Sequence, residues 1–265
     1  MNKTAISNLF SLQHKVAIIT GGAGMLGMEY GKILSDAGAR VILLDVKDSP
    51  FLNSLKKNPS YIKADITKKG EISDAMQGIE KRYKRIDILV NNAALNPVPG
   101  SENSKAQFAP YEHYPQELWE KELAVNLTGA LLATQGVVPM MKRQKAGSII
   151  NISSTYGNVA PDNRIYEKGK YKSIGYATTK GAMLNFTRAW ASYLQGTGIR
   201  VNTLTPGGVF TNQPKDFVNA YNEKTILGRM AEKTDYNGAI LFLASDASRY
   251  MTGANLIVDG GWTAW

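Results

Sequence analysis

The sequence predicts an α/β protein built as a doubly wound parallel sheet of about seven strands, with helices on both faces. Short, wholly apolar runs such as residues 16–19 are typical of parallel strands that are covered on both sides. These runs alternate with longer segments whose apolar residues recur at helical spacing, and that alternation predicts right-handed crossovers between parallel strands. The chain has 265 residues and no Pro/Gly/Ser-rich linker, so we expect a single domain over residues 1–265.

Composition excludes several kinds of site and partner. With no cysteine and only His14 and His113, we expect no disulfide, no metal site and no Ser-His triad, and we expect a cytoplasmic protein. The net charge of +9 is scattered over surface-like positions and lacks interleaved aromatic residues, which argues against nucleic acid as a partner. No apolar run approaches the ~20 residues of a membrane-spanning helix, and no secretory core is present, so no membrane is expected.

The first strand, residues 16–19, runs into a glycine-rich turn. That turn is Thr20-Gly21-Gly22-Ala23-Gly24-Met25-Leu26-Gly27, and a helix follows it as far as Gly38. A second strand at residues 40–44 closes with Asp45. Glycines let the backbone approach a pyrophosphate, the helix N-terminus supplies N–H groups, and a carboxylate can accept from a ribose 2′-hydroxyl. The turn alone could be structural, but the whole unit predicts a dinucleotide site.

Asp45 also indicates which dinucleotide binds. Its carboxylate would repel the 2′-phosphate of NADP, and the nearest cation, Lys47, lies two positions further on. We therefore expect NAD rather than NADP.

The same alternation continues to the end of the chain, with apolar runs for strands and apolar stripes for helices. Further strands are expected at residues 61–65, 86–91, 147–153, 199–204 and 255–258. Further helices are expected at residues 72–83, 115–124, 126–143, 176–194 and 234–244. Ligands in such sheets lie at the carboxyl ends of the strands.

Four connecting segments lie outside this pattern. Residues 1–14 are expected to be an N-terminal extension, and residues 95–114 a proline-containing loop. Residues 156–173 are expected to form an irregular insertion at the active site, and residues 208–225 a mobile loop that covers the substrate.

Tyr176 and Lys180 lie four residues apart in a predicted helix. Side chains at this spacing share one helical face, so a phenol and an ammonium group can point into the same cleft. A neighbouring positive charge favours the phenolate, which would make Tyr176 usable as a base near neutral pH.

The order of these motifs resembles the short-chain dehydrogenase/reductase family, in its compact single-domain type with a Rossmann-type fold. The motifs that carry the resemblance are Thr20-Gly21 to Gly27, Asp65, Asn91-Asn92-Ala93, Asn126, Ser154, Tyr176, Lys180, Pro206-Gly207, Thr211 and Val258-Asp259-Gly260-Gly261. They extend over nearly the whole chain. The family commonly forms tetramers or dimers, so the resemblance also implies a homo-oligomer that uses the two long helices and the last strand.

The resemblance implies four catalytic residues. Tyr176 would be the general acid and base, and Lys180 would lower its pKa together with the positive nicotinamide ring. Ser154 would hydrogen-bond the reacting oxygen, and Asn126 would hold a water that links Lys180 to solvent. Taken singly, each of these residues could be a core or capping residue.

The resemblance also implies a set of cofactor contacts along the chain. They are Gly21, Gly24, Met25, Leu26, Gly27, Asp45, Asp65, Ile66, Asn92, Tyr176, Lys180, Val209 and Thr211.

Two features depart from the family pattern. The glycines are spaced T-G-x-x-G-x-x-G, because Met25 stands where a glycine is usual, so we interpret Gly24 as a substitute in the same turn. The segment between Ser154 and Tyr176 is longer than usual and carries four cations, which favour an anionic or polyhydroxylated substrate. These cations are Arg164, Lys168, Lys170 and Lys172. An exposed, solvated loop is the alternative interpretation.

The sequence thus predicts an NAD(H)-dependent oxidoreductase acting on a secondary alcohol or ketone of a polar, sugar-like small molecule. The insertion and the run Thr205-Pro206-Gly207-Gly208-Val209-Phe210 are also similar to those of surface-glycan and gluconate-type oxidoreductases. Two alternatives stay open, an NADPH-dependent reductase of less polar ketones and a non-catalytic dinucleotide sensor or scaffold.

Overall fold

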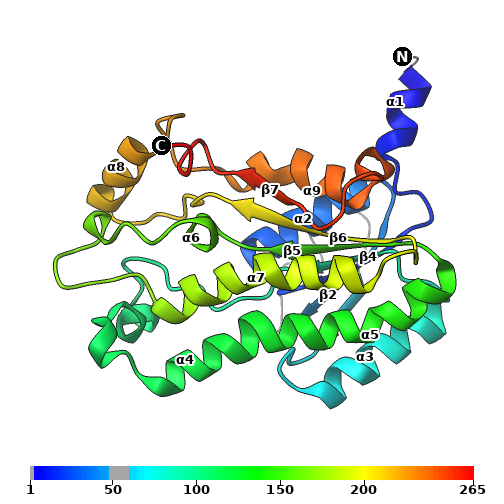
Figure 1. The fold of residues 1–265 in the computed structure, drawn as a ribbon, viewed down its shortest axis with the longest axis horizontal. Coiled ribbons are helices and arrows are strands. Elements are labelled where there is room, and N and C mark those ends of the chain that lie inside the picture. The colour runs from blue at the N-terminus through cyan, green and yellow to red at the C-terminus, as the bar shows by residue number, and fades with distance from the viewer. Residues whose placement is uncertain (1–2, 48–59) are drawn as a thin grey trace.

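The computed structural model describes residues 3–47 and 60–265 of the chain, and its centre is one parallel sheet (Figure 1). Seven strands pair in the order β3-β2-β1-β4-β5-β6-β7, which confirms the predicted fold class. The strands are β1 (Val16–Thr20), β2 (Arg40–Asp45), β3 (Ser60–Lys63), β4 (Ile88–Asn91), β5 (Gly147–Ile152), β6 (Ile199–Pro206) and β7 (Asn255–Val258).

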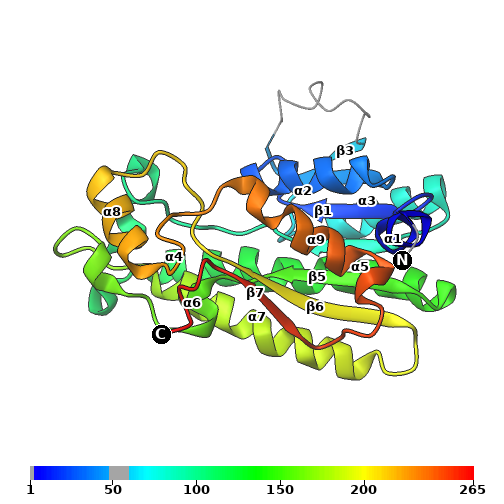
Figure 2. The ribbon, with the colours of Figure 1, turned by 90° about the horizontal axis from the view of Figure 1, so that it is seen from above.

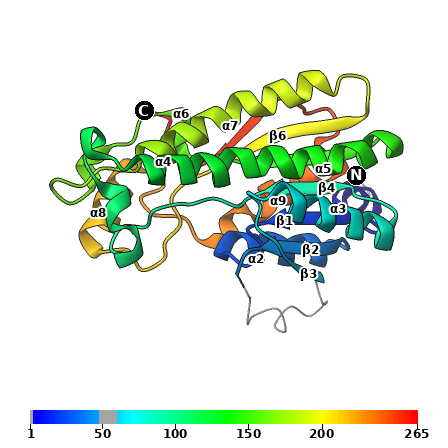
Figure 3. The same ribbon diagram turned by 90° about the horizontal axis from the view of Figure 1, so that it is seen from below.

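Helices cover both faces of this sheet. The helices are α1 (Lys3–Phe10), α2 (Met25–Asp36), α3 (Lys69–Tyr83), α4 (Gln116–Leu123), α5 (Gly129–Gln144), α6 (Thr155–Asn158), α7 (Ile174–Tyr193), α8 (Lys215–Lys224) and α9 (Asn237–Ala244). Seen from above, α2 and α9 lie over one face of the sheet (Figure 2). Seen from below, α3, α5 and α7 lie over the other (Figure 3).

Strand β1 shows why a strand in this sheet carries apolar residues on both faces. Val16 and Ile18 point into a core shared with α3 and α5, whereas Ala17 and Ile19 point into a second core shared with α2 and α9. All four side chains are buried. Each large apolar side chain contributes about 1.5–3 kcal/mol on burial, so a strand between two helical layers favours apolar residues on both faces.

One long helix replaces the two helices predicted at residues 115–124 and 126–143. Helix α4 continues through a π-helical turn (Ala124–Thr128) into α5, so the prediction of a break was wrong. A π turn takes in an extra residue without ending the helix, and such turns are frequent at functional sites. In the described part of the chain, this helix from Gln116 to Gln144 also has the length and apolar composition of a membrane-crossing helix, but it packs against the sheet through α5.

The connecting segments contain more structure than predicted. Helix α8 lies within the predicted covering loop, residues 208–225, and Pro214 precedes it, with Asp216 in its first turn and Lys224 in its last. These charges complement the helix dipole. The insertion at residues 156–173 begins in α6 and contains a 3-10 turn, Asn163–Ile165. Of the N-terminal extension, α1 is helical and residues 1–2 lie outside the described part.

The sheet changes its winding direction between β1 and β4, which are neighbours although two strands separate them in the chain. In open α/β sheets, the loops after two such strands diverge and leave a crevice at the carboxyl edge. Residues that follow β1 and β4 are therefore the first place to look for a ligand site.

Candidate active site

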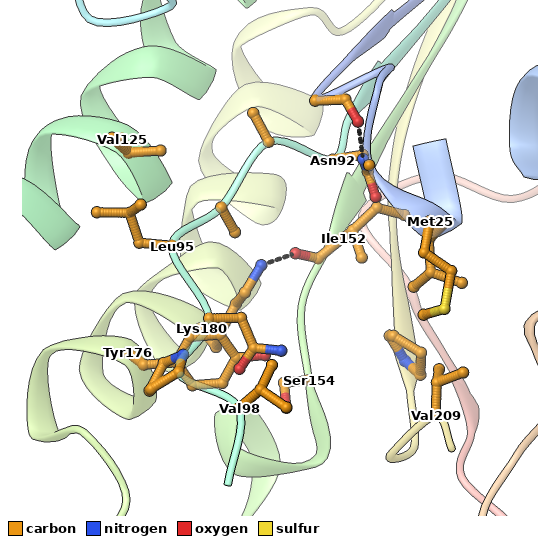
Figure 4. A pocket seen from close by; sticks show the side chains of 18 of the residues that line it. Met25, Asn92, Leu95, Val98, Val125, Ile152, Ser154, Tyr176, Lys180 and Val209 are labelled. Carbon is orange, nitrogen blue, oxygen red and sulfur yellow. Dashed lines mark hydrogen bonds between the residues drawn. The ribbon is translucent and has the colours of Figure 1, made fainter. Parts of the chain in front are cut away.

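A cavity of about 810 Å³ lies at this carboxyl edge. It is lined by the turn after β1, the ends of β2 and β5, and the segments after β3, β4 and β6. Figure 4 shows side chains from these elements and from α7 facing the same space, among them Met25, Asn92, Ser154, Tyr176 and Val209. The structure thus brings together residues that lie far apart in the sequence.

The glycine turn is so tightly packed that three of its glycines, Gly21, Gly22 and Gly27, have no room for a side chain. Gly21 has a φ of +63°, and a Cβ there would lie 2.7 Å from the Cα of Ala93. A Cβ on Gly27 would overlap the carbonyl oxygen of Gly21. Gly24 is the N-cap of α2, and a Cβ there would meet the same oxygen at 3.2 Å. The turn therefore depends on Gly21 and Gly27 more than on Gly24.

Replacing Gly27 with alanine is expected to lower the melting temperature, because the overlap costs about 1–3 kcal/mol. Gly24→Ala is the matched control in the same turn, and we expect it to stay close to the wild type. Thermal denaturation of both variants checks this order. An equal fall in melting temperature in Gly24→Ala would contradict the greater crowding at Gly27.

Thr20 and Asn92 fasten the end of β1 to the end of β4. The amide of Asn92 donates to the carbonyl oxygens of Thr20 (3.0 Å) and Gly21 (3.1 Å). The backbone N–H groups of Asn92 and Ala93 both donate to the hydroxyl of Thr20 at 3.1 Å. Thr20 was not among the predicted site residues, although a polar residue that ends a buried strand is a usable signal.

Asp45, at the end of β2, is hydrogen-bonded to the glycine turn. One carboxylate oxygen accepts from the N–H of Ala23 and the other from the N–H of Lys47, both at 3.0 Å. Asp65 and Ile66 line the cavity next to it, just after β3. Hydrogen bonds from Thr67 lower the pKa of Asp65, so this second carboxyl group also carries negative charge.

These features fit a dinucleotide. A tightly packed glycine turn leads into the N-terminus of α2, where backbone N–H groups and the helix dipole favour a pyrophosphate. A carboxylate lies at the tip of the adjacent strand, as a ribose hydroxyl requires.

Ser154, Tyr176 and Lys180 meet on the far side of the cavity (Figure 4). Ser154 follows β5 and caps α6, accepting from the N–H of Tyr156 at 3.3 Å. Tyr176 and Lys180 lie one turn apart on α7, and the Lys180 Nζ donates to the carbonyl oxygen of Ile152 at 2.7 Å. Burial lowers the pKa of Lys180 to about 8.

The protein alone does not make Tyr176 acidic. Burial raises its pKa to about 12, and the negative charge of Glu122 adds to the rise, whereas a hydrogen bond with Ser154 opposes it. Lys180 is not among the groups that shift the pKa of Tyr176, and burial lowers the pKa of Lys180 itself, which disfavours its charged form. Lowering the pKa of Tyr176 therefore requires a positive charge in addition to Lys180.

Asn126 projects from the π turn and is buried. Its Oδ1 accepts from the N–H of Leu95 at 2.8 Å, and its Nδ2 donates to the hydroxyl of Thr179 at 3.0 Å. It therefore joins the segment after β4 to the residue that precedes Lys180. Lys180 itself is not among these hydrogen-bond partners of Asn126.

The four cations of the insertion separate into two groups. Lys172 is buried and lines the cavity, whereas Arg164, Lys168 and Lys170 are exposed and do not line it. Arg164 pairs with Asp162 at 2.8 Å, and Lys170 pairs with a neighbouring glutamate at 2.6 Å. Hydration and these pairings stabilise the three exposed side chains outside the cavity, so the structure does not place them at a substrate.

Gln213 was missed by sequence reasoning and holds the segment after β6. Its Nε2 donates to the carbonyl oxygen of Val209 at 2.8 Å, and its Oε1 accepts from the N–H of Thr211 at 2.7 Å. All three residues line the cavity. A glutamine in a loop carries no pattern that would have identified it.

Glu122 was also missed, and it lies fully buried behind Tyr176. Its carboxylate accepts from Gln107 (2.8 Å), Tyr114 (2.9 Å) and Ser173 (2.8 Å). Ser173 in turn caps α7 by accepting from the N–H of Tyr176 at 2.9 Å. Glu122 therefore fixes the first turn of the helix that presents Tyr176.

The chain is similar to known proteins over most of its length. Residues 22–263 match the family model described as enoyl-(acyl carrier protein) reductase. The chain is 33% identical to a 3-oxoacyl-[acyl-carrier-protein] reductase of Thermotoga maritima, over 94% of this chain and 98% of that protein.

Two solved structures share the fold. A short-chain dehydrogenase from Leptospira borgpetersenii with bound NAD⁺ is 36% identical, with a TM-score of 0.87 over 99% of this chain and 97% of that one. A gluconate 5-dehydrogenase from Burkholderia cenocepacia, in complex with NADP and tartrate, is 27% identical, with a TM-score of 0.87 over 98% of this chain and 99% of that one. Similarity of this extent, in sequence and in fold, places the chain in the short-chain dehydrogenase/reductase family, as an oxidoreductase of alcohols and ketones.

Proposed function

We propose that this enzyme transfers a hydride between NAD(H) and a secondary alcohol or ketone of a polar metabolite, with Tyr176 as the general acid and base. The observation that carries the proposal is the convergence of Ser154, Tyr176 and Lys180 on the cavity that also contains the glycine turn. A direct test is NADH formation from NAD⁺ with a panel of sugar alcohols, sugar acids and other hydroxy acids.

Each side chain has a separate part in this proposal. The bound nicotinamide supplies or accepts the hydride. Tyr176 takes the proton of the alcohol during oxidation and returns it to the carbonyl oxygen during reduction. Ser154 hydrogen-bonds the reacting oxygen, and Lys180 holds the nicotinamide ribose. Asn126 holds a water that connects Lys180 to solvent.

The positive charge of oxidised nicotinamide is the second charge that Tyr176 needs. Because burial raises the pKa of Tyr176 to about 12 in the protein alone, a cation beside the phenol would lower it towards the working range. NAD⁺, the cofactor form that alcohol oxidation uses, would then also favour the phenolate that the oxidation requires.

NADH is expected to bind at least about tenfold more tightly than NADPH, a difference of ~1.4 kcal/mol, because Asp45 would repel the 2′-phosphate. Fluorescence titration with both cofactors measures this ratio. Asp45→Ala should reduce the discrimination, whereas Asp74→Ala, an exposed carboxylate on α3, should leave it unchanged. A preference for NADPH would contradict the assignment to NAD.

Polar and aromatic groups together favour a sugar-like substrate. Lys172 and Gln213 offer hydrogen bonds, and Tyr166 and Phe217 form a wall with ring centres 5.4 Å apart. A relative of similar fold binds tartrate, a polyhydroxylated acid. The aromatic wall also suits a less polar ketone, which makes an NADPH-dependent reductase of such ketones the second candidate.

We also propose a location and an oligomeric state for the enzyme. It is expected in the cytoplasm as a homo-oligomer, either a dimer or a tetramer, with α5, α7 and β7 at the subunit contacts. Apolar side chains are exposed on two of these elements, Tyr193 at 66% on α7 and Ile257 at 45% on β7.

A further inference from the structure

Lys172 is a buried lysine whose surroundings leave its charge unpaired. It is 5% exposed, lines the cavity, and its Nζ lies 4.3 Å from the centre of the Tyr176 ring. The Nζ donates to the Oδ1 of Asn96 at 2.8 Å and to the carbonyl oxygen of Pro97 at 3.0 Å. Both acceptors are neutral, and an ammonium group has three donors, so one donor has no hydrogen-bond acceptor among the residues that the structure describes.

Charged neighbours do not compensate this lysine directly. Among the residues that the structure describes, no carboxylate lies within ion-pair distance of Lys172. Glu122 attracts Lys172 electrostatically but forms no ion pair with it, and the carboxylate oxygens of Glu122 already accept hydrogen bonds from three other side chains. Lys180 adds a like charge, and burial with this repulsion lowers the pKa of Lys172 to about 7. A buried cation of this kind is costly without a counter-ion.

The backbone holds Lys172 in this position. Its N–H donates to the Oδ1 of Asn163 at 3.0 Å, within the insertion. The N–H of the preceding residue, Tyr171, donates to the carbonyl oxygen of Phe108 at 3.0 Å. The first bond lies within the insertion, and the second ties the insertion to the segment before α4. Together they fix the backbone from which the Lys172 side chain reaches the cavity.

We infer that Lys172 and Asn96 form a subsite for a carboxylate or phosphate group of the substrate, next to the alcohol on which Tyr176 acts. The anion supplies the missing counter-ion and takes the free donor of Lys172. This inference rests on the proposed function, because it places the substrate beside Tyr176. Of the four cations that were expected to bind the substrate, only Lys172 retains that role.

Calorimetric titration of the enzyme saturated with NAD⁺ tests the subsite. Saturation keeps the added anions out of the pyrophosphate site. The probes are tartrate, inorganic phosphate and threitol, which has the carbon skeleton of tartrate without its charges. We expect at least one anion to bind while threitol does not. Tartrate alone would assign a carboxylate, and phosphate alone would assign a phosphate group.

Two variants and a proton count identify the residue responsible. Lys172→Met should weaken the anion at least about tenfold, because a charge-assisted hydrogen bond is lost. Lys168→Met, an exposed lysine of the same segment, should not. In the wild type at pH 8, anion binding should take up a proton, because the anion raises the pKa of Lys172 from about 7.

The outcomes separate the subsite from the proposed function. Anion binding that is equal in wild type and Lys172→Met would overturn the subsite, as would equal binding of threitol or failure of both anions to bind. Failure of NAD⁺ itself to bind would contradict the proposed function instead. Intact NAD⁺ affinity in Lys172→Met shows that the variant is folded.

Discussion

Replacing Tyr176 with phenylalanine is expected to lower kcat by a factor of about 10²–10⁴ while leaving the affinity for NADH nearly unchanged. The substitution removes the hydroxyl that exchanges a proton with the substrate, but it keeps the ring, which lies 4.3 Å from the Lys172 Nζ and packs in a buried apolar cluster. Steady-state rates in both directions, with NADH binding measured by fluorescence, check both parts of this expectation.

Tyr193→Phe is the matched control, since Tyr193 ends the same helix and is 66% exposed. It should retain wild-type rates. Full activity in Tyr176→Phe would show that another group moves the proton. Loss of NADH binding in Tyr176→Phe would show that the phenol acts in cofactor binding rather than in proton transfer.

Replacing Glu122 with alanine is expected to destabilise the protein by about 3 kcal/mol or more and to lower kcat more than it changes KM. Gln107, Tyr114 and Ser173 would each lose a buried acceptor, and each unsatisfied group costs about 1–3 kcal/mol. The Tyr176 turn would also lose the group that orients its cap. A fall in Tm of about 6–12 °C should accompany this loss.

Two further variants separate orientation from general stability. Glu120→Ala removes an exposed carboxylate from the same helix and should change the stability by less than about 0.5 kcal/mol. Glu122→Gln keeps the shape but presents an amide N–H₂ to one of the three donors, so we expect a folded enzyme with reduced kcat. Wild-type kcat in folded Glu122→Gln would mean that Glu122 does not position Tyr176.

The parts of the site that sequence could predict are those with local rules. The apolar strands and the glycine turn follow from periodicity and from the backbone geometry of a strand, turn and helix. The spacing of Tyr176 and Lys180 follows from helical geometry, and Asp45 follows from its place at a strand end. Each of these features depends on residues close together in the chain.

The remaining parts depend on contacts that no local rule specifies. Lys172 could not be told from Lys168 or Lys170, because an irregular segment has no periodicity that assigns each side chain to the cavity or to solvent. Glu122 looked like an ordinary polar residue on a helix, and its role arises from two residues of the loop before it and from Ser173, far along the chain.

The most direct test of Tyr176 as both acid and base is the pH dependence of kcat in the two directions. Alcohol oxidation with NAD⁺ is expected to become faster as the pH rises, because the phenolate is the base, whereas ketone reduction with NADH should become slower, because the phenol is the acid. Both profiles should lose this dependence in Tyr176→Phe. Two profiles that change in the same direction, or a pH dependence that persists in Tyr176→Phe, would show that Tyr176 is not both the acid and the base.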